Sequence, residues 1–499
     1  MTHADSGPVP SRSHGVNWSL VILLCSALAL RLYFKAPGLL GGDAIGFAVG
    51  GLGTWIAHPP GYFGFCFLSW LVNQLFGNIN QSILFINITS CMVGIWACYR
   101  FAKAIGLSEP LALLGAAAYA FSINTVYYSD VALSYSLEGM LGTLIALTSY
   151  LAIKRQSLRL GLLATFIWAI SGAFRQNTIV FLLPLWLYTL WRSRQFRQLH
   201  WHLLIAIPIV TTWYKANQFY LNAASGNPPH NSTIKGLWTM QVMTASDYDP
   251  SKLGMDEDLK ASTSEYHWPF VEVLAWLDEK VGTHLLPSHT EFGAPAPDLG
   301  HATRLTGMQA VKLSFYTLFS IPGLLVSIFC ILFPKRKLPP SPLLPHSDWL
   351  FFAFWIVPSA LFFLVGHCGP FGYQQIYLSG LSILSILVVQ RRLIESDPHP
   401  LKNPAMISYS AFSLAGLLFF TFATPYQSSS SQEKLLDVLA LQYSGPSIKR
   451  SYSVARSNTS KPGPADIQDW VHFRSDAEIV HWWEKSFPDA KNIYRPHTR

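Results

Sequence analysis

Asp43 is the residue in this sequence that most needs a chemical explanation. It lies in the glycine-rich stretch 42–47, directly after the first long apolar segment, and it is the only acidic residue between positions 16 and 107. Ionised groups beside hydrocarbon are costly and are usually retained because they are used. An isolated carboxylate can act as a general base. The competing interpretation is a helix cap or loop acid that pairs with Arg31 or Lys35.

A histidine and a proline corner follow in the same stretch. The sequence His58-Pro59-Pro60-Gly61-Tyr62 begins the segment 61–77, whose length alone does not show whether it spans the membrane. His58 can hydrogen-bond to an anionic ligand. Alternatively it holds a turn whose backbone the two prolines fix. Both interpretations place the corner at a membrane face.

Three further charged residues are candidates. Asp130 and Glu138 lie with Ser134 between them at helical spacing, which predicts a loosely shared polar stripe. Asp130 is either a carboxylate on the substrate or metal side of a site or a helix cap. Glu138 is either a ligand contact or a buried, hydrogen-bonded structural group. Arg175 either binds a phosphate through its planar fork or extends to lipid headgroups.

Composition shows which elements must position these residues. The chain has 499 residues, of which 51% are hydrophobic and only 12% are charged, against about 25% charged in soluble domains. This predicts an integral membrane protein with many spans. The first apolar run lacks a cleavage pattern and is predicted to be retained. The net charge of +8 resides in short loops and therefore does not indicate nucleic acid binding. The six cysteines indicate no disulfide framework.

The fold class predicted is all-α, with about eleven transmembrane helices. Each run is close to the roughly 17 to 25 residues that a span requires. The predicted spans are 16–34, 79–101, 111–128, 131–153, 158–173, 178–191, 199–220, 310–333, 349–366, 373–390 and 405–422.

Charge placement decides whether residues 61–77 also cross. If they do not, the five Lys and Arg clusters at 100–103, 154–159, 192–197, 335–337 and 391–402 all lie on the side of the N-terminus. That arrangement obeys the positive-inside rule. We therefore predict a cytoplasmic N-terminus, a C-terminus outside and a juxtamembrane helix on the outer face. Arg31 and Lys35, at the outer end of the first span, are exceptions.

The domain boundaries follow from this topology. Residues 1–15 form a cytoplasmic tail and residues 16–423 the membrane domain. Within that domain, 35–78 form the first outer loop with the juxtamembrane helix, and 221–304 form a long outer loop. Residues 424–499 form an extracytoplasmic tail that contains a predicted amphipathic helix over 467–483.

In their order and spacing, these motifs resemble those of a known family. Asp43 after the first span, the corner ending at Tyr62, Tyr127-Tyr128-Ser129-Asp130, the segment from Ser134 to Glu138, and Phe174-Arg175-Gln176 resemble GT-C fold glycosyltransferases. More closely, the chain resembles the bacterial branch related to protein O-mannosyltransferases and lipid A aminoarabinose transferases. It covers roughly the first 215 residues. It implies a GT-C architecture in the cytoplasmic membrane and transfer of a sugar from a polyprenyl-phosphate-linked donor to a lipid, glycan or protein acceptor outside.

The resemblance also implies residue roles. Asp43 matches the catalytic carboxylate, whereas the acidic pair usual in the family is Gly42-Asp43 here. His58 and Arg175 are expected near the donor phosphate, and Tyr62, Asp130 and Glu138 are expected among the substrate-binding residues. The transfer is expected to invert the sugar by single displacement. A divalent metal is compatible with the pattern, and the sequence identifies no ligand set for one.

Two other classes of protein fit the hydropathy. A transporter or lipid flippase would use charges near the membrane midplane and often carries an internal repeat, whereas the charges here lie near one face and no repeat is present. A structural or assembly protein that displays the outer loop and tail would depend on no single acid.

Overall fold

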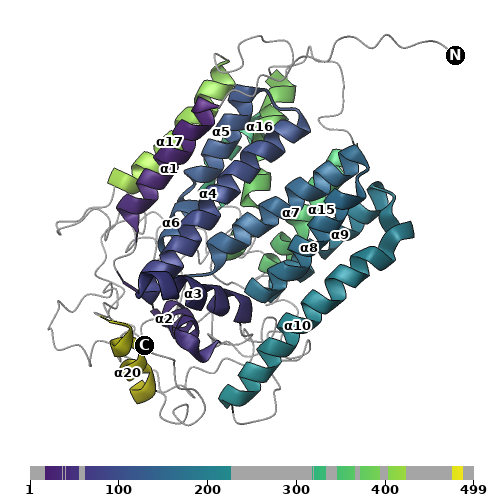
Figure 1. The fold of residues 1–499 in the computed structure, drawn as a ribbon. Coiled ribbons are helices and arrows are strands. Elements are labelled where there is room, and N and C mark those ends of the chain that lie inside the picture. Colours follow the sequence, from purple (N-terminus) through teal and green to yellow (C-terminus); the bar gives the residue numbers. More distant parts are fainter. Residues whose placement is uncertain are drawn as a thin grey trace, which may run out of the picture.

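The computed structural model describes residues 17–35, 38–39, 41–55, 62–225, 317–318, 320–332, 346–365, 371–393, 403–422 and 475–486. Apart from one isolated bridge residue, the regular structure in these ranges is helical (Figure 1). The prediction of an all-α chain is therefore confirmed for the described residues. The helices are α1 (Trp18–Phe34), α2 (Gly41–Val49), α3 (Phe63–Phe76), α4 (Ile79–Ile105), α5 (Glu109–Ala120), α6 (Ile123–Asp130), α7 (Tyr135–Arg155), α8 (Leu158–Phe174), α9 (Gln176–Arg192), α10 (Leu199–Ser225), α14 (Leu324–Leu332), α15 (His346–Val365), α16 (Gln375–Leu393), α17 (Pro404–Phe422) and α20 (Asp476–Ser486).

Several of these helices have the properties of membrane spans. Among the described residues, three helical segments are long and apolar enough to cross a membrane: α4, α7 and residues 372–390 around α16. The bent pair α5 and α6 would form a fourth span. The chain is thus an integral membrane protein with several spans. The predicted number of about eleven spans is larger than the number that these length and hydropathy criteria identify among the described residues.

The third predicted span, 111–128, is not one straight helix. It is broken between α5 and α6, and the chain bends by 55° from one helix to the other. The break has local causes: the Ser122 hydroxyl accepts the Thr125 N–H at 3.2 Å and so caps α6. On the other side of the break, Arg31 Nη2 donates to the Ala120 carbonyl at the end of α5. Hydropathy alone does not detect such a break, because both halves are apolar.

Arg31 is therefore no exception to the charge pattern. Its side chain is fully buried, and its guanidinium also donates to the Ala27 carbonyl at 3.0 Å and to Cys91 Sγ at 3.2 Å. A guanidinium inside the protein does not report which side of the membrane a loop occupies. Lys35, the other exception, donates to Gln81 Oε1 at 3.2 Å.

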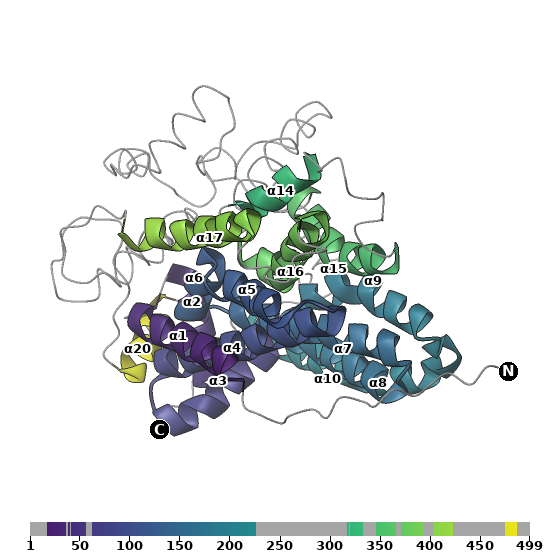
Figure 2. The ribbon, with the colours of Figure 1, turned by 90° about the horizontal axis from the view of Figure 1, so that it is seen from above.

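The first predicted outer loop is largely helical. The helix α2 was not predicted; it continues into the π-helical turn η1 (Gly50–Thr54), while α3 coincides with the predicted juxtamembrane helix. Both ends of α3 lie at the same end of the bundle. The Phe63 N–H donates to Asn217 Oδ1 near the end of α10, at 2.9 Å, and Asn73 Oδ1 accepts from the Ser82 hydroxyl in the first turn of α4, at 3.1 Å. Figure 2 shows the bundle at right angles to the first view. The helix α3 thus begins beside α10 and ends beside the start of α4.

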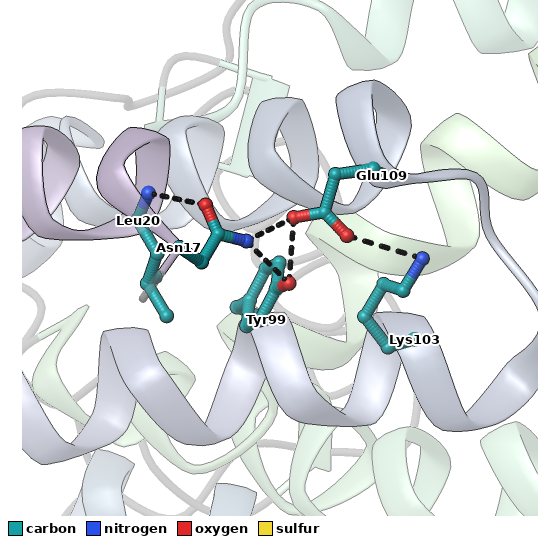
Figure 3. A network of polar contacts seen from close by, with 5 residues as sticks. All are labelled: Asn17, Leu20, Tyr99, Lys103 and Glu109. Atoms are coloured by element: carbon teal, nitrogen blue, oxygen red, sulfur yellow. Dashed lines mark hydrogen bonds and ion pairs between the residues drawn. The ribbon is translucent and has the colours of Figure 1, made fainter. Parts of the chain in front are cut away.

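A polar network joins the first helices at the opposite end of the bundle (Figure 3). Asn17 caps α1 and donates to the Tyr99 hydroxyl at 2.9 Å and also to Glu109. Tyr99 donates to Glu109 Oε1 at 2.6 Å, and Lys103 pairs with Glu109 at 3.2 Å. The start of α1 is therefore beside the end of α4 and the start of α5.

Further cationic loops share this end. Lys154 Nζ donates to the Ala104 carbonyl at 2.6 Å, and the Gln156 amide donates to the Arg192 carbonyl at 3.2 Å. The clusters at 100–103, 154–159 and 192–197 thus gather at the end that holds Asn17. The positive-inside rule predicts that these clusters lie on one side of the membrane.

Close approach of α7 and α16 depends on glycine. A Cβ at Gly142 would lie 2.3 Å from the Ile376 carbonyl oxygen, whereas a Cβ at Gly115 would make an ordinary 3.5 Å contact with Ile386. We expect Gly142→Ala to destabilise the bundle by about 1 to 3 kcal/mol, the usual cost of overpacking, and Gly115→Ala to have little effect. Thermal unfolding of the two variants in detergent checks this. Equal melting temperatures would show that α7 and α16 are not packed this closely.

Candidate functional site

Arg175 occupies the junction between α8 and α9. Its backbone is extended, its N–H donates to the Ser171 carbonyl at 2.9 Å and its carbonyl accepts the Thr178 N–H at 3.1 Å. The residue thus ends one helix and begins the next. This junction directs the side chain into the protein, where it is only 4% exposed. Headgroup snorkelling does not describe a buried guanidinium.

Glu138, in the first turn of α7, is the partner of this guanidinium. Arg175 Nε lies 3.0 Å from Glu138 Oε2, and the Glu138 side chain is fully buried. Thr178 donates to Glu138 Oε1 at 3.1 Å, and Arg175 Nη1 donates to the Ser134 hydroxyl at 3.2 Å. A buried ion pair is stable only with such additional bonds. The four residues together fix the plane of the guanidinium.

Three tyrosine rings surround the same guanidinium. The centre of the Arg175 guanidinium lies 4.0 Å from the Tyr135 ring, 4.5 Å from the Tyr373 ring and 5.8 Å from the Tyr62 ring. Cations are attracted to aromatic faces, more strongly when water is excluded. Gly372 lets this cluster form, because a Cβ there would lie 2.2 Å from the Tyr135 ring. We call Arg175, Glu138 and these tyrosines the Arg175 cluster.

Tyr62 connects this cluster to the helix that carries Asp43. The Tyr62 backbone has φ +55°, a left-handed value uncommon outside glycine, at the start of α3. Its ring packs edge-on against Phe47 of α2, with centroids 5.1 Å apart. Asp43 lies in the first turn of α2, one helical turn before Phe47. His58 lies outside the described residues, so the structure does not test its predicted position.

The predicted polar stripe from Asp130 to Glu138 is divided. Ser134 and Glu138 both contact Arg175, but Asp130 is the last residue of α6 and belongs to different surroundings. The helical spacing is lost because residues 131–134 form bends rather than a helix. Asp130 is fully buried, its nearby cation is Arg31, and neither of its carboxylate oxygens has a hydrogen-bond partner among the described residues. It does not cap a helix there.

Sequence reasoning missed parts of this site. Tyr135 makes the closest aromatic contact with Arg175, and Thr178 holds Glu138, yet neither was assigned a role. The signal available for Tyr135 is its place one helical turn before Glu138, and for Thr178 its place three residues after Arg175. Tyr373, the first residue of the predicted span 373–390, also places its ring on Arg175.

The described residues offer no cluster of metal ligands. They contain no group of three or more His, Cys, Asp or Glu side chains placed to hold a metal ion. For the divalent metal that the sequence pattern allowed, the described part of the chain therefore supplies no set of ligands.

Comparison with known proteins matches one family. Residues 57–214 match the family described as dolichyl-phosphate-mannose-protein mannosyltransferase. This range contains His58, Tyr62, Asp130, Glu138 and Arg175. The comparison with curated proteins found no match. The predicted resemblance to protein O-mannosyltransferase relatives is confirmed over this part of the chain.

The structure is also similar to solved membrane proteins. The oligosaccharyltransferase of Archaeoglobus fulgidus in its apo form is 13% identical, with a TM-score of 0.45, over 95% of this chain and 64% of that one. The same archaeal enzyme, AglB, in complex with an inhibitory peptide and a dolichol-phosphate gives a TM-score of 0.43 at 13% identity, over 94% of this chain and 63% of that one. ArnT from Cupriavidus metallidurans, bound to undecaprenyl phosphate, is 11% identical with a TM-score of 0.35 over 88% of each chain. This chain thus spans less than two thirds of the archaeal enzyme.

Proposed function

We propose that this protein is a membrane glycosyltransferase of GT-C type. It transfers a sugar from a polyprenyl-phosphate-linked donor to a lipid, glycan or protein acceptor on the extracytoplasmic face of the cytoplasmic membrane. The observation that carries the proposal is the match of residues 57–214 to a family whose description names a lipid-phosphate sugar. Arg175, Glu138, Tyr62 and Tyr135 of the Arg175 cluster lie within that range. Arg175 supplies the buried cation that a phosphate-bearing donor requires.

The reaction needs few groups. The lipid phosphate is already a good leaving group, so the protein must deprotonate an acceptor hydroxyl and stabilise the negative charge that develops on the phosphate. We assign the base to Asp43 and the phosphate contact to Arg175 and His58. Attack of the hydroxyl oxygen on the anomeric carbon displaces the phosphate and inverts the sugar. The proton passes to the Asp43 carboxylate.

The Arg175 cluster suits this role because it is preorganised. Glu138 and Ser134 contact Nε and Nη1 of the guanidinium and orient it, while the tyrosine rings exclude water from its faces. Electrostatic stabilisation is stronger where donors are fixed in advance and water is absent. Glu138 therefore acts by orienting Arg175, and Tyr62 contacts both Arg175 and Phe47 of the helix that carries Asp43.

The proposed topology places these groups outside. The helices α2 and α3 and residue Arg175 lie at the end of the bundle opposite to Lys103 and Lys154. With eleven spans and the cationic end in the cytoplasm, Asp43, Asp130 and Arg175 share the outer face. Residues 16–423 then form the membrane domain, with a cytoplasmic tail before it and the tail 424–499 outside.

Labelling of single cysteines tests this topology. In a background without native cysteines, Asn78→Cys should react with an impermeant thiol reagent added to intact cells, because residue 78 lies at the outer end of α4 and is exposed. Lys154→Cys, exposed at the opposite end, is the matched control and should be protected. The reverse pattern would place the Arg175 cluster on the cytoplasmic side and contradict the proposal.

A donor assay tests the activity itself. The purified chain in lipid vesicles is given a panel of undecaprenyl-phosphate hexoses and pentoses together with membrane extract as acceptor. We expect one sugar to be released from its phosphate and bound to an acceptor. A transporter or flippase would move the donor across the bilayer with its phosphate ester bond intact, and that outcome would replace the proposal.

A further inference from the structure

The C-terminal helix α20 packs against the helix that carries Asp43, although more than 400 residues separate them in sequence. In Figures 1 and 2, α20 lies beside α2 at the end of the bundle that holds α3. Ile479 of α20 is buried in the same apolar cluster as Ala44, Phe47 and Ala48 of α2. The tail therefore contributes to the core around the candidate base.

Asp476, in the first turn of α20, makes the polar part of this contact. Its Oδ1 accepts the Ile79 N–H at 3.1 Å, and its Oδ2 accepts from the Asn73 side-chain amide at 3.2 Å. The Ile79 N–H is one of the donors that the first turn of α4 leaves without an intrahelical partner. A carboxylate at a helix N-terminus is also favoured by the helix dipole. Asp476 thus caps α4 from the far end of the chain.

Ile79 also packs closely against the turn that follows α2. Its side chain is fully buried, and a Cβ built at Gly51 would lie 2.5 Å from Ile79 Cδ1. Gly51 belongs to the π-helical turn η1 that directly continues α2. One carboxylate therefore holds the start of α4, the end of α3 and, through Ile79, the turn after α2.

From these contacts we infer that Asp476 is a positioning residue for the transfer reaction, and that docking of α20 holds α2 in the orientation that catalysis by Asp43 requires. The inference rests on the proposed function. It gives the extracytoplasmic tail a part in the site, although this tail follows all the predicted spans and α20 is far from them in sequence. Asp476 touches no reacting atom and acts through α2.

Docking can be tested without any activity. In the purified chain lacking native cysteines, Ile479→Cys should be protected from an impermeant thiol reagent, because residue 479 is 3% exposed. His481→Cys, exposed on the same helix, is the matched control and should react rapidly. Adding Asp476→Ala should expose position 479 and leave the rate at position 481 unchanged. Equal rates at both positions with Asp476 intact would overturn the docking, whatever the protein catalyses.

Transfer measurements then test the positioning role. We expect Asp476→Ala to lower kcat roughly tenfold to a hundredfold, the scale of a small misplacement of a catalytic group, with the donor KM unchanged. His481→Gln should leave kcat unchanged. In the Asp43→Asn background, Asp476→Ala should lower kcat further by less than about twofold. The effects of substituting residues that act as a unit are not additive. If Asp476→Ala lowered kcat by its full factor in the Asp43→Asn background, Asp476 would not act through Asp43. If Asp476→Ala exposed position 479 but left kcat unchanged, Asp476 would not be a positioning residue.

Discussion

Asp43→Asn is expected to lower sugar transfer by about 10² to 10⁴, the usual cost of losing a positioned general base. Asparagine keeps the size and shape of the side chain and removes the proton acceptor. Asp43→Glu should recover little, because moving the carboxylate by one methylene spoils the geometry on which such catalysis depends. The measurement is formation of glycosylated acceptor from lipid-linked sugar in membranes, with the amount of protein determined in parallel.

The matched control removes an acid at the other end of the bundle. Glu109 is 42% exposed and pairs with Lys103 near the start of α1. Glu109→Gln should transfer sugar at close to the wild-type rate. A well-expressed Asp43→Asn variant that also transferred at the wild-type rate would exclude Asp43 as the base. Asp130, buried and without a hydrogen-bond partner among the described residues, would then have the stronger claim.

Arg175→Ala is expected to abolish use of the lipid donor and to destabilise the protein. Removing the guanidinium leaves Glu138 buried without its ion-pair partner, which typically costs about 3 to 5 kcal/mol. Arg175→Lys should retain part of the activity, because lysine keeps the charge but loses the planar fork and the stacking on the tyrosine rings. Thermal unfolding and donor-dependent transfer are measured on each variant.

A double variant separates stability from function. Arg175→Gln combined with Glu138→Gln leaves no unpaired charge, so it should recover much of the stability lost in Arg175→Ala. It should remain unable to use the donor, because the cation is still missing. Near-normal donor use by the double variant would show that the ion pair is structural only and would remove Arg175 from the site.

The parts of the fold that follow from hydropathy and charge could be predicted. Apolar runs located the long helices and α3, whose two ends contact Asn217 and Ser82. The placement of Lys and Arg further predicts that α3 does not cross the membrane. These signals are local or additive along the chain. The all-helical membrane class was therefore available from the sequence.

The features that depend on contacts between distant residues could not be predicted. The bend between α5 and α6 depends on Arg31, which sequence patterns placed at a membrane surface rather than in the interior. The helix α2 is rich in glycine, which has a low helix propensity, and forms because its apolar side packs against Tyr62 and Ile479.

The candidate site shows the same division. Arg175 and Glu138 were selected separately, by residue type and position, because ionised groups in an apolar segment are rare. Their 3.0 Å pairing and the tyrosine rings around them depend on how α7, α8 and η7 (Phe371–Gln374) meet. The spacing of residues within one helix does not predict how separate helices pack against one another.

The most direct test of the central claim is mass spectrometry of the glycolipids and glycoproteins of cells that express the wild-type chain, the Asp43→Asn variant or neither. We expect an acceptor carrying one additional sugar in cells with the wild-type chain, and no such acceptor in the other two samples. If the three samples have the same glycolipids and glycoproteins while the protein is present in the membrane, the protein is not the glycosyltransferase proposed here.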